Sequence, residues 1–202
     1  MLNSRYDYML AIVPILKPKK IIEIGIAKGI RASQLIKLSK NFNTEINYVG
    51  YDVFDTKDDK FHEMVGNGKK VLSKESIYNI LIQFTNNVTL NEGETKETLW
   101  GQEVVGDLVF IDGDHRVDSI KSDFRSLMNS ELVIFDDYYV NGFYKNFDAK
   151  YFGCNKIIDE IDEKYYCLSP KSIDLPEIKL AFYSKNTQLI DIIKNFFAKS
   201  LP

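Results

Sequence analysis

The segment at residues 21–29, with the sequence Ile-Ile-Glu-Ile-Gly-Ile-Ala-Lys-Gly, constrains the fold most strongly. Its β-branched run predicts a buried strand, its two glycines predict a tight turn, and the apolar spacing after residue 30 predicts a helix. In an open α/β sheet, ligands dock beside the carboxyl ends of the strands. We therefore expect Gly25 and Gly29 to permit close approach of a ligand to the backbone. A purely structural turn explains the same pattern if the segment is considered alone.

Further apolar runs predict a sheet with helices between its strands. They lie at residues 47–52, 87–90, 107–111 and 131–138. Four strands carry an acid at or near the carboxyl end: Glu23, Asp52, Asp112 and Asp136. Because parallel strands present these ends at one edge of a sheet, the acids predict a functional site there. A carboxylate at Asp52 is suited to accept two hydrogen bonds from a ribose diol.

Size and composition predict one domain over residues 1–202, with a long insertion at about 54–86 that is suited to form a lid. The net charge of −3 argues against a broad basic surface for nucleic acid. No apolar run reaches the ~20 residues needed to span a bilayer, so no membrane partner is expected. The two cysteines, Cys154 and Cys167, predict free thiols and a cytoplasmic location.

Five motifs in order resemble a known family. They are Glu-Ile-Gly-x-x-x-Gly at 23–29, Gly-Tyr-Asp at 50–52, Gly-Glu-Thr-Lys-Glu-Thr-Leu at 93–99, Phe-Ile-Asp-Gly-Asp-His at 110–115 and Phe-Asp-Asp-Tyr at 135–138. The set is similar to class I S-adenosylmethionine (SAM)-dependent methyltransferases, in particular to the Ile-Asp-Gly-Asp-His group that includes catechol-type and macrocin-type O-methyltransferases. The resemblance spans residues 4 to 186. It implies a Rossmann-like, doubly wound α/β sheet, mostly parallel, with an antiparallel C-terminal strand pair at 165–168 and 179–183 and helices on both faces.

The resemblance also implies a set of cofactor residues. SAM is expected to contact Glu23, Gly25, Ala27, Gly29, Asp52, Gly93, Glu94, Thr95 and Asp112. The chain lacks the Gly-x-Gly-x-x-Gly pattern of dinucleotide binders, which disfavours a nicotinamide oxidoreductase.

A divalent cation is a second implication of the resemblance. Asp112, Asp136 and Asp137 match the metal ligands of catechol-type and macrocin-type enzymes, and oxygen ligands suit Mg²⁺ or a similar cation. The structural alternative is a turn or a helix cap. Adjacent side chains of a strand point to opposite faces, so Asp136 and Asp137 converge on one ion only if the strand has ended.

His115 lies three residues after Asp112, where catechol-type enzymes carry the base that deprotonates the acceptor. A histidine that hydrogen-bonds the loop or stacks on adenine fits the sequence equally well. Asp114 is expected to bond its own loop or cap the next helix, and His62 is expected to be a solvated loop residue. Aromatic residues after residue 137, Tyr138 first among them, are candidates for contact with an acceptor.

The sequence thus predicts a SAM-dependent methyltransferase that methylates a hydroxyl of a small molecule or sugar with help from a divalent metal. Two alternatives stay open. One is metal-independent N- or O-methylation, and the other is a protein that binds SAM without turning it over. The acceptor and the oligomeric state are open as well.

Overall fold

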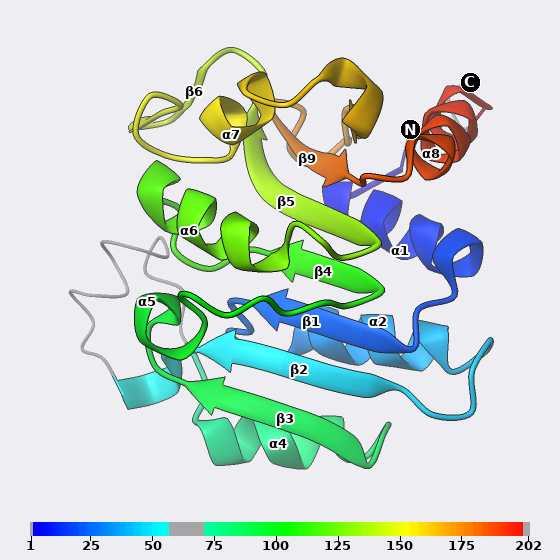
Figure 1. Cartoon of the computed structure of the whole chain (residues 1–202), viewed down its shortest axis with the longest axis vertical. Helices are drawn as coiled ribbons and strands as arrows, with labels where there is room; N and C mark the ends of the chain where they lie inside the picture. Colours follow the sequence, from blue (N-terminus) through cyan, green and yellow to red (C-terminus); the bar gives the residue numbers. More distant parts are fainter. Residues whose placement is uncertain (1, 57–70, 200–202) are drawn as a thin grey trace.

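The computed structural model describes residues 2–56 and 71–199. Its centre is a seven-stranded sheet with the order β3-β2-β1-β4-β5-β9-β8 (Figure 1). The strands are β1 (Lys20–Ile24), β2 (Asn47–Asp52), β3 (Asn87–Glu92), β4 (Leu108–Ile111), β5 (Leu132–Tyr139), β8 (Tyr166–Leu168) and β9 (Ile178–Tyr183).

Strand direction confirms the predicted fold class. Strands β1 to β5 pair in parallel, β9 pairs antiparallel with β5, and β8 pairs antiparallel with β9. The chain fills the sheet outward from β1 on one side through β2 and β3, and on the other side through β4 and β5. The order therefore reverses between β1 and β4, and such a switch point is where open α/β sheets bind ligands.

Helices cover both faces of the sheet (Figure 1). They are α1 (Arg5–Leu16), α2 (Ile30–Ser39), α4 (Lys74–Leu81), α5 (Thr95–Thr98), α6 (Val117–Leu127), α7 (Asn155–Asp159) and α8 (Thr187–Lys199), with 3₁₀ turns η1 (Phe54–Thr56) and η2 (Glu163–Tyr165). The apolar spacing after residue 30 predicted α2, whereas α5 and α7 are too short to produce a periodic signal.

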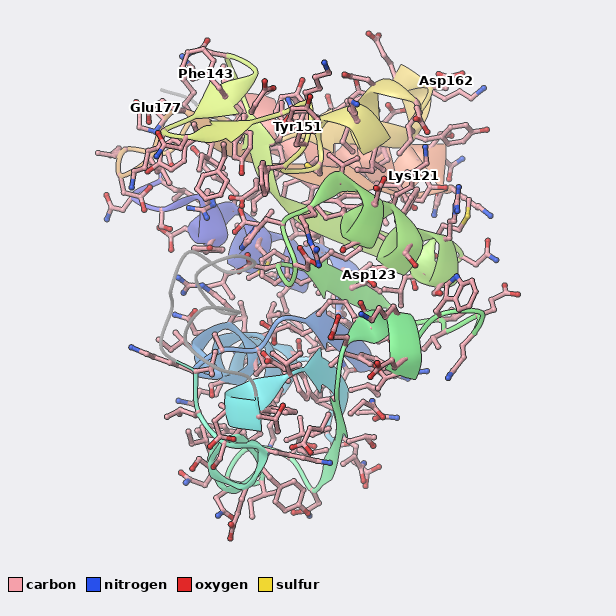
Figure 2. All side chains as sticks on the ribbon, turned by 90° about the vertical axis from the view of Figure 1, so that its left-hand side faces the viewer. Lys121, Asp123, Phe143, Tyr151, Asp162 and Glu177 are labelled. Carbon is pink, nitrogen blue, oxygen red and sulfur yellow. The ribbon has the colours of Figure 1, made fainter. Side chains whose placement is uncertain are left out.

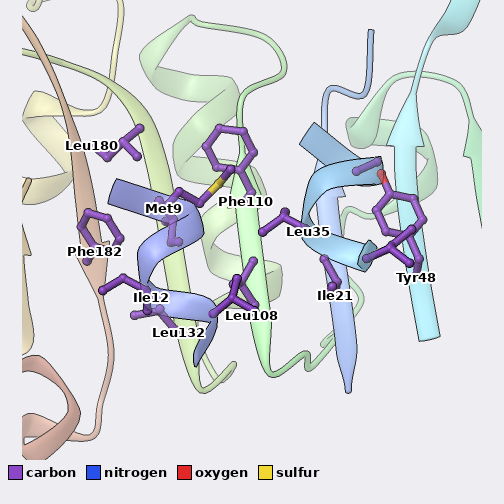
Figure 3. Packing of buried hydrophobic residues seen from close by; sticks show 14 of the residues in the cluster. Met9, Ile12, Ile21, Leu35, Tyr48, Leu108, Phe110, Leu132, Leu180 and Phe182 are labelled. Carbon is purple, nitrogen blue, oxygen red and sulfur yellow. The ribbon is translucent and has the colours of Figure 1, made fainter. Parts of the chain in front are cut away.

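The core forms two layers, one on each face, because successive side chains of a strand alternate between faces. One layer joins the sheet to α1, α2, α4 and α8, and the other joins it to α6 and α7. Figure 3 shows Met9 and Ile12 of α1 packed among side chains of the central and C-terminal strands: Leu108, Phe110, Leu132, Leu180 and Phe182. This packing fixes α1 against the middle of the sheet.

The start of α1 is held by a reciprocal capping box. The Ser4 hydroxyl accepts from backbone N–H groups of the first turn, and the Asp7 carboxylate accepts from the Ser4 N–H at 2.9 Å. Tyr6 packs edge-on against Phe110 of β4 with ring centroids 6.2 Å apart. The first turn of α1 is therefore anchored beside the central strands, and it carries Arg5 and Tyr6 to that place.

A small hairpin follows β5, formed by β6 (Phe143–Tyr144) and β7 (Phe147–Asp148). The sequence analysis singled out the aromatic residues of this segment as candidates for contact with an acceptor. It did not predict the hairpin, which holds only two residues in each strand. Figure 2 shows Phe143 and Tyr151 at the surface of this segment, where both side chains are exposed.

Cys154 and Cys167 are buried free thiols, as predicted. In the described ranges, no helix is long and apolar enough to cross a membrane. Residues 57–70 of the predicted lid, which include His62, lie outside the described residues. Its described end is α4, which begins at Lys74 with the Ser73 side chain as its N-cap.

Candidate cofactor cavity and active site

A cavity of about 490 Å³ opens at the carboxyl ends of β1, β2, β3 and β4. Among the residues that line it are most of those predicted for the cofactor, together with the predicted base: Glu23, Gly25, Ala27, Asp52, Gly93, Glu94, Thr95, Asp112 and His115. Gly29, Asp136 and Asp137 are not in the lining. The topology therefore brings the loops after four strands into one cavity. Of the three predicted metal ligands, Asp112 lines this cavity, whereas Asp136 and Asp137 do not.

Gly25 is required by the close packing of two loops. Its φ is +84°, and a Cβ atom would lie 2.2 Å from the carbonyl oxygen of Asp112 and 2.6 Å from the Cα atom of Gly113. The loops after β1 and β4 thus touch at this point. A side chain at position 25 would push these loops apart, which adds a second reason for glycine at this position of the cavity lining.

Gly29 lies at the start of α2, and its predicted contact with the cofactor stays a prediction. It is the residue before α2 and has φ +70°, a backbone conformation that glycine adopts without strain. A Cβ atom there would lie 3.2 Å from the side chain of Ile77 in α4, away from the cavity lining. Its left-handed conformation by itself favours glycine at this position.

Asp52 ties the loop after β1 to the end of β2. One carboxylate oxygen accepts from the backbone N–H groups of Ile26 at 2.6 Å and Ala27 at 2.9 Å, and the other accepts from Phe54 at 2.7 Å. A carboxylate offers about four acceptor sites. Asp52 therefore shapes the turn and keeps acceptor capacity in the cavity that it lines.

Glu23 is a buried carboxyl group in the cavity wall, 1% exposed. Burial raises the pKa of Glu23 to about 8, although the hydrogen bond that Tyr48 donates at 2.6 Å favours the ionised form. The charges of Asp112 and Asp52 raise this pKa further, and that of Arg31 lowers it. A cationic ligand beside these carboxyl groups would relieve their repulsion.

Asp136 and Asp137 lie inside β5 rather than after it, yet their carboxylates converge. The pairing of β5 with β9 shifts register between Phe135 and Tyr138, and Asp137 has φ +59°. This irregularity breaks the alternation of side chains along the strand. The two carboxylates therefore converge although the strand has not ended, which corrects the condition that the sequence analysis set.

The group between these two carboxylates is Arg5. Its Nε donates to Asp136 Oδ1 at 2.6 Å, its terminal nitrogen donates to Asp136 Oδ2 at 2.8 Å, and the same nitrogen lies 3.8 Å from Asp137 Oδ1. Tyr6 also donates to Asp136 Oδ2, at 2.8 Å, and the Asp137 N–H donates to Asp136 Oδ1. All three charged side chains are buried. Asp136 therefore accepts four hydrogen bonds from Arg5, Tyr6 and Asp137 within the described part of the chain.

The predicted metal site is not confirmed. In residues 2–56 and 71–199, no group of three or more His, Cys, Asp or Glu side chains is arranged to hold a metal ion. The four acceptor sites of Asp136 are filled by protein donors, and a guanidinium lies where a cation would have to bridge Asp136 and Asp137. Asp136, Asp137 and Asp112 therefore do not fit a divalent cation in this arrangement.

His115 and Asp137 form a buried pair. His115 Nδ1 lies 2.7 Å from Asp137 Oδ2, and His115 lines the cavity. Because a carboxylate only accepts, Nδ1 carries the proton, and the basic nitrogen of the neutral ring is Nε2. An acid that holds a histidine in this tautomer is the arrangement that prepares a general base.

Asp114 has the structural role that the sequence predicted. Its carboxylate accepts from the Arg116 backbone and side chain and, at 2.7 Å, from the Ser119 hydroxyl on α6. Tyr138, the aromatic residue favoured for acceptor contact, does not line the described cavity.

Sequence reasoning missed several residues of the cavity wall, chiefly Tyr6, Arg31 and Arg116. Arg31 lies over the Tyr6 ring, with its guanidinium carbon 3.9 Å from the centroid. Tyr6 and Arg31 come from the first turns of α1 and α2, which read in the sequence only as ordinary helix starts. Their convergence depends on the packing of α1 beside α2, for which a single helix carries no signal.

The chain resembles known proteins in structure but not detectably in sequence. No protein-family model matches the chain, and no curated protein matches it in sequence. Solved structures do match. The O-methyltransferase TomG from Streptomyces achromogenes, in complex with SAM, superimposes with a TM-score of 0.57 at 12% identity, over 91% of this chain and 81% of that one.

The O-methyltransferase from Bacillus cereus, in complex with S-adenosylhomocysteine (SAH), matches with a TM-score of 0.56 at 12% identity, over 92% of this chain and 83% of that one. The chain has the class I SAM-dependent methyltransferase fold. Spermidine synthase from Thermotoga maritima matches as well, with a TM-score of 0.54 at 17% identity over 98% of this chain and 66% of that one. The class I methyltransferase fold is therefore shared by proteins with different names, and the reaction has to be argued from the site.

Proposed function

We propose that the chain is a SAM-dependent O-methyltransferase that acts, as one domain, on a hydroxyl group of a small molecule or sugar. The observation that carries the proposal is the cavity at the switch point, where nearly all the predicted cofactor residues meet His115. SAM- and SAH-bound structures of the same fold add support.

The charges of the cavity suit the cofactor. SAM carries a positive sulfonium and a positive amino group, and Glu23, Asp52 and Asp112 supply carboxyl groups in the wall. Arg31 offers a cation for the carboxylate of the methionine part. At Gly25 no side chain stands between the loops after β1 and β4, and this glycine lines the cavity.

When bound, SAM supplies a methyl group that is already activated, because its sulfur leaves as a neutral thioether. The protein then has to place the acceptor and remove its proton. His115 Nε2 takes the hydroxyl proton as the oxygen attacks, and Asp137 stabilises the imidazolium that forms. This division of labour assigns Asp137 to the base rather than to a metal.

The test is turnover of His115→Gln, measured as SAH formed with a panel of catechols, sugars and small hydroxylated compounds. A general base contributes about 10²–10⁴-fold, so turnover should fall by that factor while SAM binding stays near that of the parent. His62, the other histidine of the chain, provides the matched control as His62→Gln. Unchanged turnover in His115→Gln would remove the base from the mechanism. A parent protein that binds SAM and methylates no compound shown to occupy the cavity would favour a non-catalytic SAM-binding protein.

A further inference from the structure

Arg5 occupies the position that a bridging cation would need. Its guanidinium contacts both carboxylates, at 2.6 and 2.8 Å to Asp136 and at 3.8 Å to Asp137. The planar fork of an arginine matches a carboxylate in two hydrogen bonds, and the charge is permanent. Two buried carboxylates side by side need such a positive charge, because their repulsion would otherwise force one of them to take up a proton.

The position of Arg5 is built into the fold rather than sampled by a surface side chain. Arg5 is the first residue of α1, where the capping box of Ser4 and Asp7 fixes the helix start. Arg5 as a whole residue is 8% exposed, and Tyr6 accepts a hydrogen bond from its guanidinium at 2.9 Å. The charge of Asp136 raises the pKa of Arg5 above its usual range although burial alone would lower it, so Arg5 stays charged.

Asp136 and Asp137 lie behind the residues that line the cavity. Asp136 and Asp137 do not line the cavity, whereas Tyr6, which bonds Asp136, and His115, which bonds Asp137, both do. An acceptor in the cavity would meet a phenol and an imidazole. A metal ion held by these two acids would not face an acceptor directly.

We propose that Arg5 is a resident cation that replaces a divalent metal in this site, and that it holds Asp136 and Asp137 so that Asp137 can position His115. Arg5 is thus a positioning residue that acts through Asp137. The methyl transfer that it supports rests on the function proposed above, but its effect on metal binding does not. The two ideas can therefore fail separately.

The first measurement is a calorimetric titration of the intact chain with Mn²⁺, repeated on Asp136→Asn. We expect no Mn²⁺ binding that depends on Asp136, so any binding elsewhere in the chain should be equal in the two proteins. Mn²⁺ binding by the parent that Asp136→Asn abolishes would overturn the proposal. This comparison requires no methyl acceptor and no change at Arg5.

The second measurement is thermal unfolding of Arg5→Ala with and without Mn²⁺. Removal of the guanidinium leaves buried carboxylates uncompensated, so the midpoint should fall and Mn²⁺ should recover part of the loss. Arg31→Ala is the matched control, because Arg31 also lies over the Tyr6 ring but hydrogen-bonds Gln34 instead of the acids. Arg31→Ala should gain no response to Mn²⁺. A folded Arg5→Ala with the midpoint of the parent and no response would contradict the proposal. If Arg5→Ala does not fold, the first measurement decides alone.

A catalytic consequence follows for the same variants. If Arg5 acts through Asp137 and His115, Arg5→Ala should lose turnover with little change in the KM for SAM, and Arg5→Lys should recover part of it. A loss that appears only in the KM for SAM would show that Arg5 serves the cofactor instead. Turnover that a chelator reduces in the parent, and that added Mg²⁺ restores, would also contradict the proposal.

Discussion

Glu23 is a residue of the cavity wall whose pKa is raised by burial. Its folded pKa is about 8 against a usual value of 4.5, chiefly because burial penalises the charged form. The folded state therefore holds this proton more tightly than the unfolded chain does. The contribution of Glu23 to the free energy of unfolding is fully present below about pH 4.5. It falls as the pH rises toward 8 and changes no further above that. Each unit of difference in pKa corresponds to about 1.4 kcal/mol.

We predict that Glu23→Gln flattens this part of the stability profile, because glutamine keeps the shape and cannot ionise. Thermal midpoints of parent and variant should differ progressively between pH 4.5 and 8. Asp123, whose pKa burial raises to about 7, offers a comparison on α6, where Figure 2 labels it. Asp123→Asn should act in the same direction but level off near pH 7. Parallel profiles for Glu23→Gln and the parent would show that Glu23 titrates normally.

Single residues show how far the sequence could predict the site. The acids and glycines at the strand ends were visible because each motif is local. Arg5 was not, because 131 positions separate it from Asp136 and nothing in the first turn of α1 signals a buried ion pair. Asp137 was recognised as a site residue. Its pairing with His115, however, depends on a bulge in β5 that the sequence does not reveal.

Among the elements, α1 connects stability to the site. Its N-terminal capping box fixes the turn that carries Arg5 and Tyr6, and its apolar face packs on the centre of the sheet (Figure 3). We predict that Ser4→Ala costs about 1 kcal/mol, which corresponds to ~2–4 °C in a chain of this size. It should also lower turnover, because Arg5 and Tyr6 lose their fixed start.

Ser73→Ala is the matched control for this effect. Ser73 caps α4 in the same way, by accepting from the Ser76 N–H at 3.2 Å. Both variants should lose similar stability in thermal unfolding, and only Ser4→Ala should lose turnover. Equal turnover in the two variants would mean that α1 serves the fold alone.

The elements that the sequence predicted well are the long ones. The run at 47–52 predicted a strand and the spacing after residue 30 predicted a helix, and the structure places β2 and α2 there. The hairpin β6–β7 and helix α7 hold too few residues for a period to emerge. Their positions are set by tertiary contacts such as the Gly153 N–H bond to the His115 carbonyl.

Over the whole molecule, the order of the sheet explains why the site lies where it does. The reversal between β1 and β4 opens a space at their carboxyl ends, and the loops after β2 and β3 complete its wall (Figure 1). Helix α1 closes one side through Tyr6. A parallel sheet with helices on both faces was predictable from alternating strand and helix patterns, and its doubly wound form from the family resemblance, whereas the closure by α1 required the three-dimensional packing.

Calorimetric titration of the intact chain with SAH, and separately with NAD⁺, tests the central claim most directly. The account predicts one SAH bound per chain and no binding of NAD⁺, because the cavity has carboxyl groups for a charged amino group and lacks the glycine pattern for a pyrophosphate. SAH is the suitable probe because it cannot be turned over. A chain that binds NAD⁺ in place of SAH, or that shows no heat with SAH or SAM, would contradict the account.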